Sequence, residues 1–561
     1  MEGQTLHAAL DKVAAEQPGV ALSFPADGVE LSLSRLSLES RQLAGRLRRL
    51  GIRNGERVAS LCQNEPDFLL LLFAVSRLGA CLCPLSMPTG SLEAFSIKAR
   101  AVLGDAGITT VMLSSQVGRM PEAIREPLAG YRQISLADCW PEARLADEQV
   151  LGEEIDGGHE VVLQYTSGST SLPKGVQLTH DNVLACLRAI VAGMDVTAGD
   201  RLAMWLPFFH DMGLFSTLSM ALSAVPVTVW QPSYFVRNPA RWLRDFADGR
   251  HTIGVLPNFG FDYLVQAVPA ETAADYDLSR WRIAFNGAEQ IAVESVEAFV
   301  EHFAPSGFRP GAMFPVYGLA EATLAATFPP VGRCPVFDWV DRSRLSEQGL
   351  ATPADPRQPG ARAVANVGRP VLGMELRIAD PATGAVLAER LVGEVQLRGP
   401  SVTAGYLAEA AALEQPFSPD GWLRTGDLGY LVDGELHVTG RLKEMILLRG
   451  ENYYPEDVES AVRSDPGVYR RHCVAFVHAG GGREQMVLLA ETGRSAAEHA
   501  ELADHLRTLV RGAVGLDDLV VVLAKRGAIP RTSSGKLQRL VAKHDFAKAD
   551  ADKEEASHAH A

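Results

Sequence analysis

Short apolar runs alternate with amphipathic stretches over most of the chain, and this alternation is typical of an α/β fold. Residues 66–78 form the clearest predicted helix, and leucines recur at helical spacing in the segment 36–50. The order of elements predicts a large N-terminal domain with mixed sheets and helices. Strand patterns occur at residues 57–62, 202–206, 225–230, 253–256, 376–378 and 394–397.

The chain changes character near Gly440. Before this point, the segment 336–366 is less regular and rich in proline. After it, charged residues become denser, and a compact α/β pattern of domain size follows. The last residues are Ala, Lys, Glu, Asp and His, without a core-forming pattern. We therefore predict a large domain at 1–440, a small C-terminal α+β domain at 441–546 and a disordered tail at 547–561.

Composition and charge exclude several classes of function. The chain has 561 residues, 47% of them hydrophobic and 22% charged, as in globular proteins with a sizeable core. Its net charge of −15 argues against nucleic acid as a partner. The seven cysteines are scattered without zinc-ligand spacing, and no apolar run is long enough to span a bilayer. We expect reduced thiols, a cytoplasmic location and no membrane span.

The strongest chemical signal is the loop at 165–175, Tyr-Thr-Ser-Gly-Ser-Thr-Ser-Leu-Pro-Lys-Gly, which follows an apolar strand pattern at 161–163. Glycines let a backbone approach a ligand closely, and hydroxyls, exposed N–H groups and a lysine bind phosphate oxygens. The loop is not a P-loop, because Lys174 precedes Gly175 and no Ser or Thr follows. A flexible Ser/Gly linker is the alternative. The loop therefore predicts a triphosphate site.

Four more clusters carry possible chemistry. Each has a plain explanation when taken alone, because Glu321 could be a surface carboxylate, Asp427 a turn residue, Arg441 an ion-pair partner and Lys536 a solvated lysine. The clusters are 317–323 (Tyr-Gly-Leu-Ala-Glu-Ala-Thr), 421–429 (Gly-Trp-Leu-Arg-Thr-Gly-Asp-Leu-Gly), 440–444 (Gly-Arg-Leu-Lys-Glu) and 530–537 (Pro-Arg-Thr-Ser-Ser-Gly-Lys-Leu).

Together and in this order, the five motifs resemble those of the adenylate-forming (acyl-activating) enzyme superfamily, over residues 10 to about 545. A closer resemblance is to the fatty acyl-AMP ligases, and the segment 336–366 falls where these enzymes carry an insertion. Phe208-Phe209, Glu451 and Tyr453 depart from that subgroup's usual residues. The features that carry the closer resemblance are Gln164, Ser171, 205–207 (Trp-Leu-Pro), 210–213 (His-Asp-Met-Gly), 257–259 (Pro-Asn-Phe), 286–289 (Asn-Gly-Ala-Glu) and 449–457.

The resemblance implies ATP and Mg²⁺ as cofactors and assigns the nucleotide site. Glu321 would ligate magnesium, which prefers oxygen ligands. Asp427 would accept hydrogen bonds from the ribose, and Arg441 would contact the nucleotide. The β- and γ-phosphates would lie against Thr166, Ser167, Gly168, Ser169, Thr170 and Lys174, and the adenine against Gly287, Ala288, Glu289, Tyr317 and Gly318.

The resemblance also implies a two-step reaction. A fatty acid carboxylate would attack the α-phosphorus of ATP, giving acyl-adenylate and pyrophosphate, with Lys536 as the catalytic cation. The small C-terminal domain would then rotate about a hinge at Lys443 and deliver the acyl group to an acyl carrier protein. That acceptor could be the carrier domain of a polyketide or nonribosomal peptide synthetase. The insertion would restrain the rotation.

The acyl chain would enter an apolar pocket. Lining residues are expected at Phe209, His210, Met212 and Phe259, with Phe208, Leu214 and Phe261 as further candidates. Because carrier proteins are acidic, a local basic patch is expected, and Arg463, Arg470 and Arg471 are candidates for it. Solvated arginines with no such role are the alternative.

Three competing functions remain open at this stage. A fatty acyl-CoA ligase would carry the same adenylation residues and use free coenzyme A. A non-catalytic scaffold that binds nucleotide or a carrier would be expected to lack Lys536, Glu321 or Asp427, and all three are present. An amino-acid-activating domain would need a buried carboxylate for the substrate ammonium, for which Asp211 is the candidate.

Overall fold

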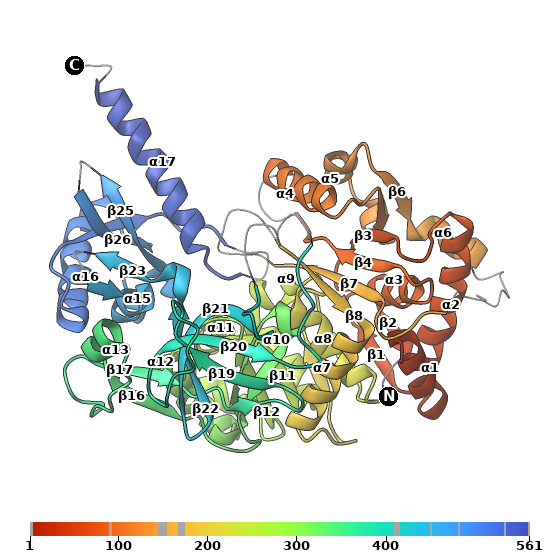
Figure 1. The fold of residues 1–561 in the computed structure, drawn as a ribbon, viewed down its shortest axis with the longest axis horizontal. Helices are drawn as coiled ribbons and strands as arrows, with labels where there is room; N and C mark the ends of the chain where they lie inside the picture. Colours follow the sequence, from red (N-terminus) through yellow and green to blue (C-terminus); the bar gives the residue numbers. More distant parts are fainter. Residues whose placement is uncertain are drawn as a thin grey trace.

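The structure is a computed structural model, and its fold is the predicted α/β arrangement of mixed sheets and helices (Figure 1). Two mainly parallel sheets dominate the N-terminal part, and a smaller group of strands and helices follows toward the C-terminus. The residues described are 4–88, 92–143, 154–166, 174–407, 416–448, 451–480, 483–531 and 535–558.

The first large sheet has the strand order β13-β12-β11-β9-β10-β1-β2 within the described residues. Its strands run parallel except at the edge pair β1 and β2, which is antiparallel. Strands β9, β11, β12 and β13 are buried on both faces, as parallel sheets require, whereas β1, β2 and β10 are only partly buried. They are β1 (Ala21–Phe24), β2 (Val29–Ser32), β9 (Leu202–Met204), β10 (Val227–Val229), β11 (Ile253–Pro257), β12 (Ile283–Gly287) and β13 (Met313–Pro315).

The second large sheet has the order β6-β5-β3-β4-β7-β8 over the part of the chain described. Only the pair β7 and β8, which flanks the predicted phosphate loop, is antiparallel. This hairpin directs both ends of the loop to one edge of the sheet. The strands are β3 (Arg57–Leu61), β4 (Cys81–Pro84), β5 (Thr110–Leu113), β6 (Arg132–Ser135), β7 (Glu160–Tyr165) and β8 (Gly175–Thr179).

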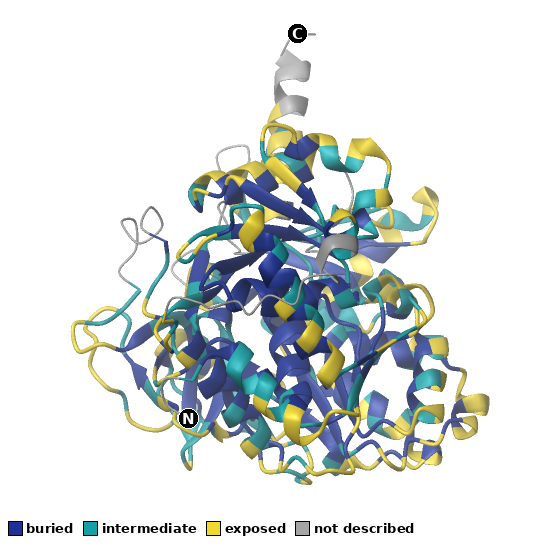
Figure 2. Cartoon of the chain, turned by 90° about the vertical axis from the view of Figure 1, so that its right-hand side faces the viewer, coloured by how far each residue is buried: buried dark blue, intermediate teal, exposed yellow. Residues whose placement is uncertain are grey.

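Helices cover both sheets, and buried side chains fill the space between them (Figure 2). Helix α3 is buried on nearly all sides, because its sequence is apolar all round. No helix in the described ranges has the length and apolar character needed to cross a bilayer. The helices of this part are α1 (Leu6–Glu16), α2 (Leu33–Arg49), α3 (Pro66–Ser76), α4 (Leu92–Asp105), α5 (Glu122–Arg125), α6 (Leu136–Ala143), α7 (His180–Gly193), α8 (Asp211–Ala221), α9 (Pro232–Arg237), α10 (Pro239–Asp248), α11 (Asn258–Ala267) and α12 (Val293–His302).

Two antiparallel sheets carry the chain from the large sheets to the C-terminal part. In the larger one, the pairing of β21 with β22 sets Asp427 directly opposite Arg441. Cross-strand neighbours on one face lie close enough to interact, so this register assembles part of the site. The strands are β14 (Tyr317–Gly318), β15 (Ala325–Phe328) and β18 (Arg369–Pro370) in one sheet, and β19 (Glu375–Ala379), β20 (Gly393–Arg398), β21 (Leu423–Val432) and β22 (Glu435–Arg441) in the other.

The segment 336–366 is more regular than predicted. It forms an antiparallel pair, β16 (Phe337–Asp341) and β17 (Ala361–Ala365), with helix α13 (Arg342–Gln348) between the strands. The prolines that suggested irregularity lie in the loop between α13 and β17, where they interrupt no element. This unit lies beside the C-terminal part, below α15 and α16 in Figure 1, and α13 contacts β24.

The residues after β22 pack around a hydrophobic core of their own. A short turn of 3-10 helix, 442–444, leads into them. The elements are β23 (Ile446–Leu448), β24 (Glu451–Tyr453), α15 (Pro455–Arg463), β25 (Cys473–Gly480), β26 (Arg483–Glu491), α16 (His499–Val514), β27 (Leu519–Ala524) and α17 (Arg539–His558).

The disordered tail predicted from residue 547 differs from the structure, in which α17 continues as helix to His558 and projects from the body (Figure 1). The segment is rich in Ala, Lys and Glu, which favour helix intrinsically. Its base is anchored, since Phe546 packs on Phe476 at 5.7 Å between ring centroids and Asp550 lies 2.9 Å from His478 Nε2.

Candidate active site

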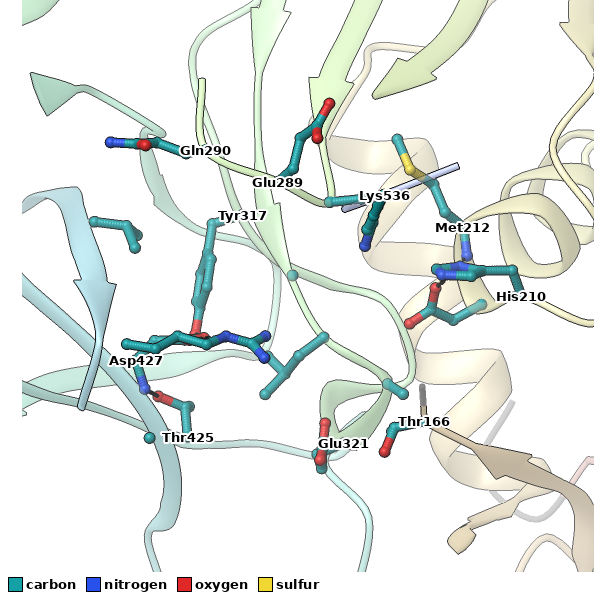
Figure 3. Close-up of a pocket in the computed structure, with 18 of the residues that line it drawn as sticks. Thr166, His210, Met212, Glu289, Gln290, Tyr317, Glu321, Thr425, Asp427 and Lys536 are labelled. Atoms are coloured by element: carbon teal, nitrogen blue, oxygen red, sulfur yellow. Dashed lines mark hydrogen bonds and ion pairs between the residues drawn. The ribbon is translucent and has the colours of Figure 1, made fainter. Parts of the chain in front are cut away.

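A cavity of about 810 Å³ lies where the large domain meets the C-terminal part. Its wall includes the ends of β7, β12 and β21, the turn after β14, and the loop that carries Lys536. In Figure 3, Tyr317, Thr425 and Asp427 lie together on one side, Glu321 and Thr166 lie below, and Lys536 lies on the other side with His210 and Met212. The motifs singled out in the sequence therefore meet in one site.

Asp427 is the centre of a hydrogen-bonded group on one wall. The hydroxyl of Tyr317 donates to Asp427 Oδ2 at 2.7 Å, and Arg441 Nε donates to Oδ1 at 3.1 Å. Burial and the neighbouring carboxylate raise the pKa of Tyr317 well above its usual value, so its hydroxyl keeps its proton. A carboxylate held in this way presents a fixed acceptor to ligand hydroxyls.

Glu321 lines the cavity near the base of the predicted phosphate loop. Tyr406 donates its hydroxyl to Glu321 Oε1 at 2.6 Å, and Lys174 Nζ lies 5.2 Å from the centroid of the Tyr406 ring. The amide of Thr166 donates to the carbonyl of Lys174 at 3.0 Å, which closes the base of the β7–β8 hairpin. Ser167, Gly168, Ser169 and Thr170 lie outside the described residues. Tyr406 escaped the sequence analysis because its context, Ala404-Gly405-Tyr406, shows no charged or metal-binding pattern.

The donors near Glu321 suit magnesium that arrives with a nucleotide. Magnesium is usually held by one or two carboxylates together with phosphates and water. Among the described residues, no group of three or more His, Cys, Asp or Glu side chains could hold a metal alone. Burial raises the pKa of Glu321, so a cation bound there would also stabilise its charged form. The residues thus fit a metal shared with phosphate oxygens.

Lys536 extends into the cavity from the loop after Arg531. Burial lowers its pKa, while the carboxylates of Asp211 and Glu289 act in the opposite direction. Asp211 is 9% exposed, its Oδ1 lies 2.6 Å from His210 Nδ1, and the amide of Met212 donates to the same oxygen at 2.6 Å. Glu289 accepts from the amide of Phe259 at 2.6 Å. Both carboxylates are therefore fixed in place.

The loop that presents Lys536 packs closely on the large domain. Gly535 has a φ of +95°, and a side chain built there would place its Cβ 3.0 Å from the ring of Phe259. Glycine meets both demands, because it tolerates positive φ and lets the backbone approach the ring. This contact fixes the depth to which Lys536 reaches into the cavity.

Several expected residues lie in other places than the motifs suggested. Glu289 lines the cavity near Lys536 and away from Tyr317, so it does not stand beside the ring expected to stack on adenine (Figure 3). Gly287 and Phe259 lie outside the cavity wall, whereas Ala288, Gly318, Lys443, Phe209, His210 and Met212 line it.

Phe259 contacts the Trp205 and Tyr263 rings instead, because α11 turns its side chain behind the wall. Phe208 and Phe261 pack in the core, on Phe68 and Phe299, and Leu214 is also fully buried.

The proposed basic patch is largely occupied by internal contacts. Arg463 Nη2 lies 2.8 Å from Glu459 Oε2, and Arg471 Nη1 lies 2.7 Å from Asp262 Oδ1 on α11. The guanidinium of Arg470 stacks 4.9 Å above the ring of Tyr263. Two of these arginines bind neighbouring carboxylates and the third covers an aromatic ring, so their grouping in sequence does not make an open patch.

The other end of the cavity is apolar. Gln164 donates from Nε2 to the carbonyl of Phe209 at 2.9 Å and thereby fixes the chain where the polar and apolar ends meet. An apolar cavity with a few polar groups at one end is suited to a long hydrophobic ligand with a polar head. Apart from Ser216, the lining of this end is apolar: Ile190, Met212, Phe285, Ile291, Val316, Leu324, Ala325 and Phe328.

Comparison with known proteins identifies the family. The model of the AMP-binding enzyme family matches residues 10–407, and the chain belongs to this family. It is 35% identical over 96% of its length to a putative acyl-CoA synthetase of Caulobacter vibrioides, of which 94% is covered. It is 34% identical over 94% of its length to the medium-chain-fatty-acid–[acyl-carrier-protein] ligase JamA of Moorena producens, of which 91% is covered.

A solved structure agrees with these relatives. The chain is 32% identical to a protein described in a study of fatty acyl-adenylate ligases from E. coli and L. pneumophila, with a TM-score of 0.89 and 98% of each chain covered. The resemblance to the fatty acyl-AMP ligases is thereby confirmed, and the chain is an adenylate-forming ligase.

Proposed function

We propose that this chain activates a fatty acid with ATP to an acyl-adenylate and then transfers the acyl group to the phosphopantetheine of an acyl carrier protein. The observation that carries the proposal is one cavity whose lining includes the polar residues Asp427 and Glu321, the cation Lys536 and a set of apolar side chains. The acyl chain of a fatty acid matches the apolar side chains of the cavity, and ATP matches its polar residues. The carboxylate of the acid and the α-phosphate of ATP would then meet beside Lys536.

In the first step, a carboxylate oxygen of the acid attacks the α-phosphorus, and the bond to pyrophosphate breaks. Asp427 holds the ribose, Tyr317 lies against the adenine, Lys174 offsets the charge of the outer phosphates, and Thr166 donates a hydrogen bond to them. Lys536 stabilises the negative charge that builds on the acid and the α-phosphate. Magnesium at Glu321 would supply further positive charge for the phosphates.

In the second step, a thiol of the carrier attacks the acyl carbon, AMP leaves and the thiol proton is released. The C-terminal part would rotate about Lys443 to withdraw Lys536. The inserted unit would restrain this rotation, because Arg362 Nε on β17 lies 2.9 Å from Asp457 Oδ1 on α15. An acceptor that is itself tethered near the enzyme tolerates a slow rotation better than a freely diffusing one does.

The acceptor separates two candidate functions. The relative named as an acyl-carrier-protein ligase supports a carrier protein or a synthetase carrier domain, and the ion pair between insertion and α15 supports the same choice. The relative named as a putative acyl-CoA synthetase supports the alternative, a fatty acyl-CoA ligase. The proposal includes a cytoplasmic location, which seven cysteines without disulfides favour.

A product assay tests the proposal. The purified chain is incubated with ATP, magnesium and fatty acids of graded length, with no acceptor, with coenzyme A, or with a phosphopantetheinylated carrier, and the products are identified by mass spectrometry. We expect acyl-adenylate in all three arms and transfer to the carrier alone. Efficient formation of acyl-coenzyme A would establish the alternative, and absence of any acyl-adenylate would overturn the proposal.

A further inference from the structure

The apolar end of the cavity finishes against an aromatic cluster. Phe328, at the end of β15, lines the cavity and is 8% exposed, and Phe285 lines it beside Phe328. Their ring centroids lie 5.4 Å apart, and Phe314 stands behind both at 5.2 and 5.4 Å. All three rings meet edge to face, an arrangement that stabilises aromatic clusters. The cluster closes this end of the cavity.

The backbone that carries Phe328 has little freedom to move. Phe328 pairs with Arg369 across the β15–β18 contact. Gly368 lies so close that a Cβ built on it would be 2.0 Å from the carbonyl oxygen of Phe328. Because strand and neighbour are in direct backbone contact, a change in the ring position must come from side-chain rotation.

Helix α7 supports the ring from the other side. A Cβ built on Gly193 would lie 2.7 Å from Cδ2 of Phe328, closer than atoms of real side chains approach. The glycine stands one turn after Ile190, which lines the cavity. The absence of a side chain at this position is therefore what lets the Phe328 ring lie back against the helix.

We propose that Phe328, positioned by Gly193, ends the acyl pocket and sets the longest straight acyl chain that the enzyme accepts. The inference rests on the proposed function and narrows it to acids with a sharp upper limit of chain length. The terminal methyl of the longest good substrate meets the face of Phe328. A further methylene would have to displace a ring that is enclosed by Gly193, Phe285 and Phe314.

Two variants are expected to move the limit in opposite directions. Phe328→Ala removes the ring and opens space, so longer acids become substrates. Gly193→Ala pushes the ring away from α7, and since Phe285 and Phe314 close the other sides, the ring turns into the cavity and the limit becomes shorter. One methylene in an apolar pocket changes discrimination by about 10-fold or more.

The experiment measures kcat/KM for acyl-adenylate formation with straight-chain acids of about 6 to 18 carbons, a range that spans pockets of ordinary size. Relative to the wild-type optimum, we expect longer acids to gain about 10-fold or more in Phe328→Ala and the longest good acid to lose about 10-fold or more in Gly193→Ala. Gly512→Ala, at an exposed helical glycine with open space around it, is the control and should keep the wild-type profile.

The outcomes separate this inference from the proposed function. If the wild type forms acyl-adenylate and neither variant moves the limit, or both move it the same way, Phe328 does not end the pocket although the proposed function stands. If no acid yields acyl-adenylate in the wild type, the proposed function fails first. Thermal melts check that each variant folds. If Gly193→Ala does not fold, Phe328→Trp takes its place as the variant expected to shorten the limit.

Discussion

At the scale of single residues, Lys536 combines two conditions that rarely occur together. Its ammonium group is buried, which disfavours the charged form, while Asp211 and Glu289 favour it. A cation that is already desolvated and directed needs little reorganisation when negative charge develops beside it. In the mechanism proposed above, the two carboxylates would act on catalysis through Lys536.

Lys536→Ala should lower the rate of acyl-adenylate formation by about 10²–10³-fold, because one preorganised electrostatic contact is lost. Nucleotide binding should persist, since Asp427, Tyr317 and Arg441 are unchanged. Single-turnover formation of adenylate and calorimetric ATP binding check the two parts. Lys543→Ala, at an exposed position on α17, is the matched control. A variant of Lys536 with near wild-type turnover would remove the lysine from the mechanism.

The alkaline limb of the adenylation rate should report the pKa of Lys536. Burial lowers this pKa, so the rate should fall at a pH below the usual lysine value of 10.5 as the cation is lost. Asp211→Asn removes a negative charge that raises the pKa, and the limb should move to lower pH. The other groups facing the lysine, Glu289, Arg441 and Asp427, are unchanged, and His210 loses its ion-pair partner. An unshifted limb in Asp211→Asn would mean that another group titrates.

At the scale of secondary-structure elements, the sequence correctly predicted those helices and strands that a local pattern of apolar residues determines. The strands at 57–62 and 253–256 and the helix at 66–78 occur within one or two residues of the predicted bounds, because each is a run of apolar residues with clear ends. The hairpin in the segment 336–366 was missed, since β16 has one buried residue and its pairing with β17 joins residues 20 or more positions apart in sequence.

The site was predictable to the extent that its residues lie in motifs. Asp427 and Arg441 were recognised from their motifs, and the β21–β22 register explains why they meet. Tyr406 reaches Glu321 from a loop 85 residues away in sequence, which no local pattern indicates. Phe259 shows the reverse case: its motif suggested that it lines the acyl pocket, but its side chain faces away from the cavity.

The N-terminus of α3 gives a prediction about stability. Glu65 is 2% exposed, and burial raises its pKa from 4.5 to about 7. The folded state therefore binds a proton that the unfolded state releases, and stability is full below about pH 4.5 and falls as pH rises toward 7. A shift of this size corresponds to about 3 kcal/mol at most.

Glu65→Gln should remove this pH dependence, because the amide stays neutral and still accepts the amide hydrogen of Gln63. Melting temperatures measured at about pH 5 and about pH 8, on either side of the folded-state pKa of about 7, should differ less in the variant than in the wild type. Glu16→Gln, at an exposed position, should behave as the wild type. Equal pH dependence in Glu65→Gln and wild type would contradict the assignment.

At the scale of the whole molecule, two groups of polar contacts between described residues help to hold the C-terminal part against the rest, in addition to the packing of Gly535 on Phe259. Arg471 Nη1 donates to Asp262 Oδ1 on α11 and to Ser295 Oγ on α12, in both cases at 2.7 Å. On the other side, Arg362 and Arg342 both approach Asp457, at 2.9 and 3.6 Å. The position of Lys536 depends on both groups of contacts.

Asp457→Asn should loosen the contact with the insertion. If the lost charge pair contributes about 1.4 kcal/mol, the fraction of molecules in which the C-terminal part has separated from the insertion (the open population) should rise about tenfold. Trypsin cleavage after Lys443, which tracks the open population when closing is fast, should accelerate by a similar factor. The control is Glu501→Gln, at an exposed position on α16. Unchanged cleavage in Asp457→Asn would show that this contact does not restrain the C-terminal part.

Arg470 and Arg471 make one of these contacts with unusual backbone angles, at φ values of +50° and +62°. Residues with side chains are disfavoured in this region, at about 1–3 kcal/mol each. Part of what the Asp262 ion pair and the Tyr263 ring contribute to this contact is offset by that strain. We therefore expect the contact between the C-terminal part and α11 to be specific in geometry yet shallow in free energy, which would let the C-terminal part leave it readily in the rotation proposed above.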